Sequence, residues 1–225
     1  MASPLVVFDL DGTLVDTAPD LIASLNVVFA REGLGLISLN EGRDMIGGGV
    51  RRLIERGLAL QGRTFATAQV DALFADYITH YAEHIADNSR PFPGLAAALD
   101  ALAARGNRFA VCTNKLEWLS VRLLDQLNLS ARFVAICGRD TFGIEKPDPA
   151  ILRRTIAAAG GDLADAIMVG DSGTDISTAR AAGVPVVAVD FGYTEVPVTE
   201  LDPDHVISHF DALPEAVGAL MRRPM

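Results

Sequence analysis

Basic residues are in short supply in this 225-residue chain. Lys and Arg together number 19 against 29 Asp and Glu, which gives a net charge of −10. A surface of this charge repels nucleic acids and anionic membranes, so we expect neither as a partner. An anionic small molecule is repelled at long range too, so a site for one must rely on local cations, backbone N–H groups and a metal ion.

Cysteine and long apolar runs are also scarce. Cys112 and Cys137 are the two cysteines. They lie in apolar, strand-like surroundings, which predicts buried free thiols in a reducing compartment and excludes a disulfide framework. No apolar run approaches the ~18 residues of a membrane span. The opening MASPLVVFDL has no basic segment before an apolar stretch, so it does not resemble a signal peptide. We therefore expect a cytoplasmic protein.

The chain does have short, uninterrupted apolar runs at intervals. Such β-branched runs are typical of strands buried on both faces of a sheet. Segments with helical spacing, often flanked by glycine or proline, lie between them. This alternation predicts an α/β fold, a Rossmann-like parallel sheet with helices on both faces. The expected strands are 5–8, 108–112, 133–137, 166–169, 184–189 and 205–207. The expected helices are 94–105, 115–127, 149–159, 174–182 and 211–221.

Residues 16–90 interrupt the alternation. They show three or four helical patterns, and no convincing strand separates them. We interpret this stretch as a small all-helical cap domain inserted after the first strand. The α/β core would then comprise residues 1–15 and 91–225. The expected helices of the insertion are 17–33, 39–46, 50–60 and 66–86, and the expected hinges are 16–19 and 87–93.

Polar residues follow several of the expected strands, where the crevice of an open α/β sheet lies. Asp9 and Asp11 follow the first strand, and their spacing puts both carboxylates on one side of an extended chain. Two adjacent carboxylates repel each other unless a cation joins them, and Mg²⁺ prefers such oxygen ligands. One carboxylate could attack phosphorus while the other handles a proton. A plain Asp-Gly turn after a strand is the alternative interpretation.

Two further strand ends carry groups suited to an anion. Thr113 and Asn114 offer a hydroxyl and backbone N–H groups at a helix start, which suits a phosphate. Lys146 stands before Pro147, which favours an extended backbone there, and its ammonium could screen a nucleophile and a phosphoryl group. A capped helix start and an exposed lysine are the structural interpretations of the same residues.

A second pair of carboxylates follows the strand at 166–169. Asp171 and Asp175 lie about one helical turn apart and could share a metal site, one directly and one indirectly. An N-capping aspartate with a surface aspartate would give the same pattern. The order of the four groups is more informative than any one of them. Together they suit the hydrolysis of a phosphate ester, which needs positioning and charge neutralisation around the phosphoryl oxygens.

These motifs resemble those of the haloacid dehalogenase superfamily, over essentially the whole chain. The stretch 9–17 (DLDGTLVDT) is similar to its first motif, Thr113-Asn114 to its second, Lys146 to its third, and the stretch 170–175 (GDSGTD) to its fourth. An aspartate at position 11 is characteristic of the phosphatase and phosphomutase branches, so the resemblance argues against dehalogenation. The helical insertion resembles the mobile cap of that superfamily.

The resemblance implies a role for each matching residue. Asp9 would be the nucleophile and Asp11 the general acid and then base. Mg²⁺ would be bound by Asp9, by Asp171 and by the backbone carbonyl of Asp11, with Asp175 supporting them. Lys146 would assist catalysis, and it would bind the phosphate of the substrate together with Thr113 and Asn114.

Further stretches of the chain resemble those of one branch of the superfamily, the bacterial phosphoglycolate phosphatases. They are 14–21 (LVDTAPDL), 46–49 (IGGG), 80–81 (HY), 91–94 (PFPG), 113–115 (TNK) and 145–149 (EKPDP). This similarity implies a small phosphate ester as substrate, phosphoglycolate above all. Phosphatases of pyrophosphate, sugar phosphates or nucleotides share several of the same stretches. A hexose-phosphate mutase, or a phospho-ligand-binding protein that kept the fold, would also be compatible with the motifs. A monomer or a homodimer would both fit.

The expected cap offers two features of its own. The glycines 47–49, followed by Arg51 and Arg52, could bind the carboxylate of a small acid or could simply form a turn. His80 and His84 would share one helix face and could bind zinc. The sequence offers no third ligand near them, so we expect a packing or surface role.

Overall fold

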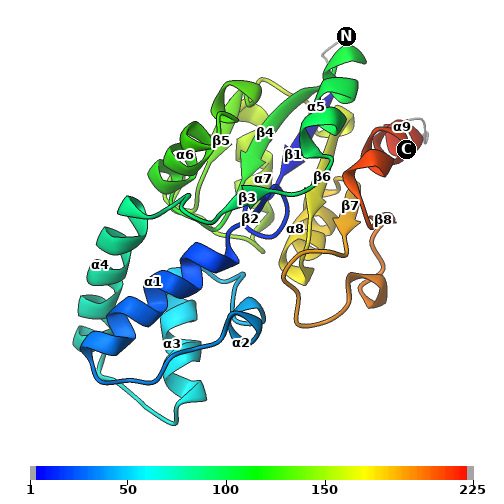
Figure 1. Ribbon diagram of the computed structural model, residues 1–225. Helices are drawn as coiled ribbons and strands as arrows, with labels where there is room; N and C mark the ends of the chain where they lie inside the picture. Colours follow the sequence, from blue (N-terminus) through cyan, green and yellow to red (C-terminus); the bar gives the residue numbers. More distant parts are fainter. Residues whose placement is uncertain (1–3, 222–225) are drawn as a thin grey trace.

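The computed structural model describes residues 4–221. Its centre is a six-stranded sheet with the order β5-β4-β1-β6-β7-β8, in which every neighbouring pair is parallel (Figure 1). The predicted α/β fold with a Rossmann-like sheet is therefore confirmed. The strands are β1 (Leu5–Phe8), β4 (Arg108–Cys112), β5 (Ala135–Cys137), β6 (Ala166–Gly170), β7 (Val186–Val189) and β8 (His205–Ile207).

The central strand β1 explains why the sheet must be covered on both faces. All four of its residues are fully buried. Val6 and Phe8 belong to one apolar core, whereas Leu5 and Val7 belong to a second. Because successive side chains of a strand point to opposite faces, the two cores lie on opposite sides of the sheet. An uninterrupted apolar run is the sequence pattern that this arrangement requires.

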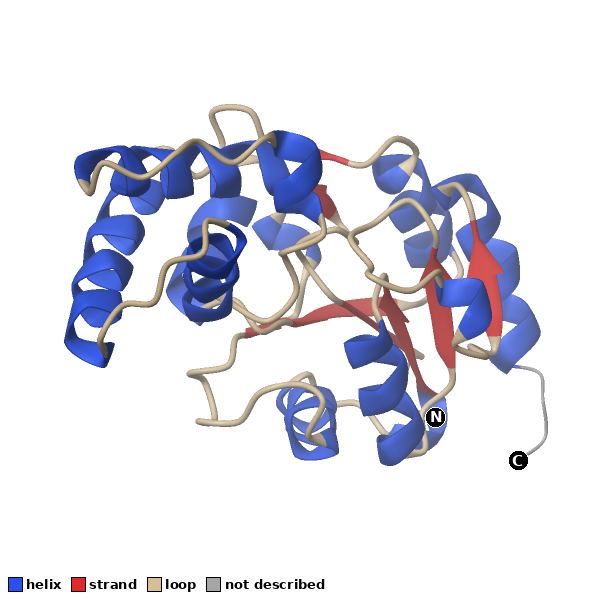
Figure 2. Cartoon of the chain, turned by 90° about the horizontal axis from the view of Figure 1, so that it is seen from below, coloured by secondary structure: helices blue, strands red, loops and turns tan. Residues whose placement is uncertain are grey.

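Helices cover both faces of the sheet. Helices α7 and α8 pack on one face against β4, β5, β6 and β7, whereas α9 packs against β6 and β8, with α5 beside it. Helix α6 packs beside the edge strand β5. Figure 2 shows helices on both sides of the strands. The bounds are α5 (Leu95–Ala104), α6 (Glu117–Gln126), α7 (Pro149–Ala158), α8 (Gly173–Ala182) and α9 (Leu213–Met221). None of the helices in residues 4–221 has the length and apolarity that crossing a membrane requires.

The segment between β1 and α5 forms a separate group of helices to one side of the sheet (Figure 1). Helix α1 packs against α2 and α4, and α3 packs against α4. Their bounds are α1 (Ala18–Arg31), α2 (Leu39–Arg43), α3 (Val50–Leu60) and α4 (Thr67–Glu83). The expected helical character of this stretch is confirmed, while its assignment as a separate domain of residues 16–90 stays a prediction.

Two short strands that the sequence did not predict lie at the two ends of the insertion, and none interrupts its four helices. Strands β2 (Val15–Asp16) and β3 (Arg90–Pro91) pair antiparallel where the chain enters and leaves the helical group. Two residues are too few to show an alternating pattern, so the pairing could not be read from the sequence. Asp20 joins the same two connections, because its carboxylate accepts hydrogen bonds from the backbone and side chains of Asn88 and Ser89 at 2.7–3.0 Å.

Candidate active site

The polar residues predicted at the strand ends do meet at one edge of the sheet. Asp9 follows β1, and its N–H donates to Val169 O in β6 at 2.9 Å. Thr113 follows β4, and Asp171 follows β6. Strands β4 and β6 both flank β1, so parallel pairing brings the three carboxyl ends side by side.

Three carboxylates form a compact cluster there. Ligand atoms of Asp9, Asp171 and Asp175 all lie within 4.8 Å of one another, and this is the one such acidic cluster that the described residues contain. Asp171 is held from two sides: its Oδ1 accepts from Thr13 Oγ1 at 2.8 Å, and its Oδ2 accepts from the backbone N–H of Tyr193 at 2.6 Å.

Asp175 is held by the start of its own helix. It is fully buried at the third position of α8, where Ser172 is the N-cap. Its Oδ2 accepts from Ser172 Oγ at 2.7 Å and from Ser172 N at 3.2 Å, which forms a capping box. Helix capping therefore fixes one carboxylate of the cluster.

The turn after β1 leaves no room for a side chain at Gly12. This residue has φ +85°, and a Cβ there would lie 2.3 Å from Asp171 Oδ2. Glycine satisfies both the left-handed backbone and the close approach.

Lys146 supplies the cation that the cluster needs. Its Nζ lies 2.6 Å from Asp175 Oδ1 and 2.8 Å from Asp9 Oδ1. The contact to Asp175 is a hydrogen bond, whereas the one to Asp9 has ion-pair distance without hydrogen-bond geometry. Burial lowers the pKa of Lys146, but the carboxylates of Asp175 and Asp9 outweigh it and hold the pKa above its ordinary value. Lys146 is therefore charged at neutral pH.

Asn114 fixes the backbone that carries this lysine. Its Oδ1 accepts from Lys146 N at 2.8 Å, and its Nδ2 donates to Lys146 O at 3.1 Å. The side-chain amide of Asn114 is thus used to position Lys146.

The cluster has the charge and chemistry of a cation site. Burial raises the pKa of Asp9 to about 6, with Asp175 adding to the rise and Lys146 opposing it. Burial and the carboxylates of Asp175 and Asp9 also raise the pKa of Asp171 well above its ordinary value. Three carboxylates and one ammonium leave two uncompensated negative charges when all are ionised. Oxygen ligands with that surplus fit a hard divalent cation.

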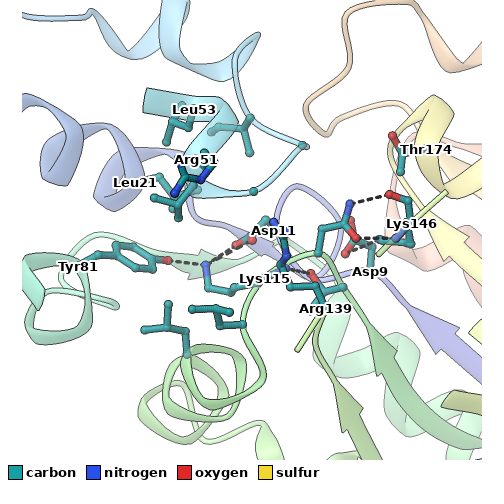
Figure 3. Close-up of a pocket in the computed structure, with 18 of the residues that line it drawn as sticks. Asp9, Asp11, Leu21, Arg51, Leu53, Tyr81, Lys115, Arg139, Lys146 and Thr174 are labelled. Carbon is teal, nitrogen blue, oxygen red and sulfur yellow. Dashed lines mark hydrogen bonds and ion pairs between the residues drawn. The ribbon is translucent and has the colours of Figure 1, made fainter. Parts of the chain in front are cut away.

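Asp11 lies apart from the cluster and has its own partner. Lys115 Nζ donates to Asp11 Oδ1 at 3.0 Å and to Oδ2 at 3.3 Å. The same ammonium donates to Tyr81 Oη of α4 at 2.7 Å. Lys115, in the loop between β4 and α6, therefore contacts both the predicted catalytic carboxylate of Asp11 and helix α4 of the insertion (Figure 3).

A cavity of about 290 Å³ opens between the sheet edge and the helices of the insertion. Its volume suits a small ligand. Asp9 and Lys146 lie at one end of the labelled group and Tyr81 at the other (Figure 3). The lining includes all the predicted catalytic and phosphate-binding residues, Asp9, Asp11, Thr113, Asn114 and Lys146. Arg51 and part of the glycine turn, Gly47 and Gly49, line it as well.

Several residues of this site were not predicted. Lys115 follows Thr113 and Asn114 directly, so its place in that motif was an available signal. Thr13 lies within the first motif and could also have been singled out. Tyr81 belongs to the stretch His80-Tyr81, which resembles phosphoglycolate phosphatases, but the sequence assigned it no role in the site. Tyr193 carries no comparable signal, because it lies in the loop after β7. The histidines His80 and His84 stack on each other and contact Ser24 and Asp87.

Comparison with known proteins agrees with this geometry. The family model of haloacid dehalogenase-like hydrolases matches residues 6–189. A phosphoglycolate phosphatase of Mesorhizobium japonicum is 50% identical over 213 residues, which cover 95% of this chain and 94% of that protein. One of Agrobacterium fabrum is 48% identical over 215 residues, covering 96% and 92%.

Solved structures show the same similarity. The crystal structure of a predicted phosphoglycolate phosphatase from Haemophilus somnus matches with a TM-score of 0.89 at 28% identity, covering 95% of this chain and 97% of that one. The region matched by the family model runs from β1 to the end of β7, so it contains every strand end that contributes to the carboxylate cluster. This chain belongs to the haloacid dehalogenase-like hydrolase family.

Proposed function

We propose that this protein hydrolyses a small phosphate monoester, 2-phosphoglycolate, to glycolate and phosphate through an aspartyl-phosphate at Asp9. The single observation that carries the proposal is the position of Asp9. It faces a cavity for a small ligand and lies beside a buried ammonium at 2.8 Å and two further carboxylates. The relatives named phosphoglycolate phosphatase, at up to 50% identity over nearly the full chain, support this choice of ester.

In the first step, a carboxylate oxygen of Asp9 attacks phosphorus and the bond between phosphorus and the ester oxygen breaks. Asp11 gives its proton to the departing oxygen, which leaves as the hydroxyl of glycolate. Lys146 and the Thr113 hydroxyl offset the negative charge on the phosphoryl oxygens. The product of this step is a phosphorylated Asp9 and an ionised Asp11.

In the second step, water attacks the phosphorus of the aspartyl-phosphate. Asp11 takes a proton from that water, and the acyl–phosphate bond breaks to release phosphate. Asp9 is restored as a carboxylate and Asp11 as an acid, so protons and bonds balance over the cycle.

We propose Mg²⁺ as the cofactor, held by Asp9 and Asp171 and by the backbone carbonyl of Asp11, with Asp175 behind them. Mg²⁺ would neutralise charge that develops on the phosphoryl oxygens. The surplus of two negative charges in the carboxylate cluster supports this assignment, as do its oxygen ligands.

We further propose that residues 16–90 act as a cap on a core of residues 1–15 and 91–225. The cavity lies between these two parts, and its lining comes from both. A closed cap would exclude water while the first step proceeds, and its opening would admit water for the second.

The test is phosphate release from phosphoglycolate, pyrophosphate, hexose phosphates and nucleoside monophosphates, with Mg²⁺ and with a chelator. The Asp9→Asn variant should lose at least a thousandfold in kcat, while a matched surface variant, Asp76→Asn, should keep its rate. Preference for another ester would contradict the assignment of 2-phosphoglycolate as the substrate but would leave the proposed mechanism intact. Full turnover by Asp9→Asn would overturn the mechanism, and isomerisation of a hexose phosphate without phosphate release would indicate a mutase.

A further inference from the structure

Lys115 and Tyr81 place two hydrogen-bond donors at the part of the cavity remote from Asp9. The Lys115 side chain is 4% exposed, and its ammonium lies 2.7 Å from Tyr81 Oη and 4.5 Å from the centre of the Tyr81 ring. Both residues line the cavity, and Figure 3 shows Lys115 between Tyr81 and the sheet edge. Neither residue has a part in the two steps of the proposed hydrolysis.

Both groups retain an unused donor. An ammonium has three N–H groups. Within residues 4–221, the Lys115 ammonium donates to the Tyr81 hydroxyl and to the Asp11 carboxylate, whose two oxygens lie 3.0 and 3.3 Å from Nζ and share one N–H because they lie in nearly the same direction. The Tyr81 oxygen accepts from Lys115, and in the same part of the chain the structure describes no acceptor for the hydroxyl hydrogen. Burial keeps Tyr81 neutral, because it raises the pKa of the phenol well above its ordinary value.

The other cations of the cavity are less suited to a ligand. Arg51 forms an ion pair with Asp71, and Arg139 forms one with Glu145 at 2.7 Å. Their side chains are 42% and 38% exposed, so solvent screens them. Lys146 is committed to the carboxylate cluster. Lys115 is therefore the buried cation of this cavity that can bind the part of the substrate remote from phosphorus.

We propose that the Lys115 ammonium and the Tyr81 hydroxyl together bind an acidic group on the carbon part of the substrate. The preferred substrates are then short phosphate esters with a carboxylate close to the ester-bearing carbon. This proposal rests on the proposed phosphatase function and deepens it. It also moves the carboxylate site from the cap turn at 47–49, where the sequence placed a candidate, to the junction of α4 with the sheet edge.

The position of Lys115 next to Asp11 favours this site. Lys115 contacts the carboxylate of Asp11, the residue that gives its proton to the leaving oxygen in the proposed first step. A carboxylate close to the ester-bearing carbon therefore lies near Lys115 when the leaving oxygen meets Asp11.

The test compares two esters of similar size, 2-phosphoglycolate and 2-hydroxyethyl phosphate, which has a hydroxymethyl group in place of the carboxylate. The measured quantity is the ratio of their kcat/KM values in the wild type and in Lys115→Gln and Tyr81→Phe. We expect this ratio to fall at least tenfold in Lys115→Gln and severalfold in Tyr81→Phe. Because the ratio is taken within each variant, a partial loss of folded protein cancels.

Arg51→Gln is the matched control, since it removes a cation that lines the same cavity from the cap side. Its ratio should stay within twofold of the wild type. The proposal is overturned if both esters slow equally in Lys115→Gln, because Lys115 would then only orient Asp11. A fall of the ratio in Arg51→Gln alone would also overturn it and would place the carboxylate at the cap turn.

Glycolate binding separates failure of this proposal from failure of the proposed function. Glycolate has the carboxylate but no phosphorus, so isothermal titration of the Mg²⁺-loaded protein measures the subsite without turnover. We expect Lys115→Gln to weaken glycolate binding at least tenfold and to leave binding of inorganic phosphate within threefold. Equal glycolate binding by the wild type and Lys115→Gln would overturn the subsite, whereas absent turnover of both esters by the wild type would overturn the phosphatase assignment alone.

Discussion

Asn114 holds the backbone of Lys146 with both polar atoms of its side-chain amide, at 2.8 and 3.1 Å. The two residues are 32 positions apart and lie on loops after different strands. This contact fixes the backbone of Lys146, and the carboxylates of Asp9 and Asp175 fix the position of its ammonium group. Asn114 thus supports the site through Lys146.

Replacing Asn114 should therefore impair turnover more than binding. In Asn114→Ala, Lys146 loses both backbone partners and its ammonium shifts relative to Asp9. We expect kcat for phosphate release to fall by roughly 10- to 100-fold, because displacements of about 1 Å have effects of this size. KM should change less than threefold in steady-state assays.

The chain contains a close match for this contact that serves as a control. Asn26 makes the same pair of bonds to the backbone of Ile37, at 2.8 and 2.9 Å, within the insertion. Neither residue lines the cavity. Asn26→Ala should lower the melting temperature and leave kcat unchanged. An equal loss of kcat in the two variants would contradict a specific role for Asn114.

Removing Lys146 should destabilise the metal-free protein. Lys146→Met leaves Asp9 and Asp175 without their cation in a buried setting, and losing one partner of a buried pair costs about 3–5 kcal/mol. Thermal unfolding in chelator should show this loss. Adding Mg²⁺ should restore more stability to the variant than to the wild type, because the ion then supplies the missing positive charge.

Arg31→Met is the matched control for that experiment. Arg31 pairs with Asp76 at 3.7 Å, and both side chains are more than half exposed. Exposed pairs contribute about 0–1 kcal/mol, so this variant should unfold near the wild-type temperature. A Lys146→Met protein as stable as the wild type in chelator would show that the carboxylates need no cation.

The stability of the metal-free protein should fall as pH rises from about 4 to about 6. Burial raises the pKa of Asp9 from 3.8 to about 6 in the folded state. The folded protein therefore holds a proton that the unfolded chain releases, so this contribution is full below pH 3.8 and is lost as pH passes about 6. Unfolding midpoints in chelator across this range test the slope, and Asp9→Asn should flatten it. A wild-type slope of the opposite sign would contradict the assignment.

Mg²⁺ binding should show the reverse dependence on pH. The ion competes with the proton on Asp9, whose pKa burial raises to about 6. Affinity measured by titration calorimetry should therefore increase as pH rises from 5 to 7 and then level off. Affinity that is independent of pH over this range would argue against Asp9 as a ligand.

Asp20 should stabilise the junction between the insertion and the rest of the chain. Its buried carboxylate accepts hydrogen bonds from Asn88 and Ser89, on the opposite connection. Asp20→Ala leaves these donors without a partner, which we expect to cost about 2–3 kcal/mol of unfolding free energy. Urea unfolding measures this loss. Asp76→Ala removes an exposed carboxylate of the insertion and should cost less than 1 kcal/mol.

The α/β architecture and the main groups of the site follow from the amino-acid sequence alone. The run at 5–8 has no polar residue, and such a segment is stable only when both faces of its sheet are covered. Asp9, Thr113 and Asp171 follow apolar runs directly, and parallel strands bring their ends to one edge. These inferences depend on local pattern and on the general geometry of sheets, so one sequence was sufficient.

Which groups pair with one another is known only from the folded chain. In the sequence, Asp11, Lys115 and Tyr81 are three unrelated positions, up to 104 residues apart, yet they form one connected group. The sequence also could not reveal that Asn114 positions Lys146, or that β2 and β3 pair beside the insertion. Such contacts depend on how the loops and the insertion pack, and local patterns of hydrophobicity and turn residues contain no information about distances between segments remote in the chain.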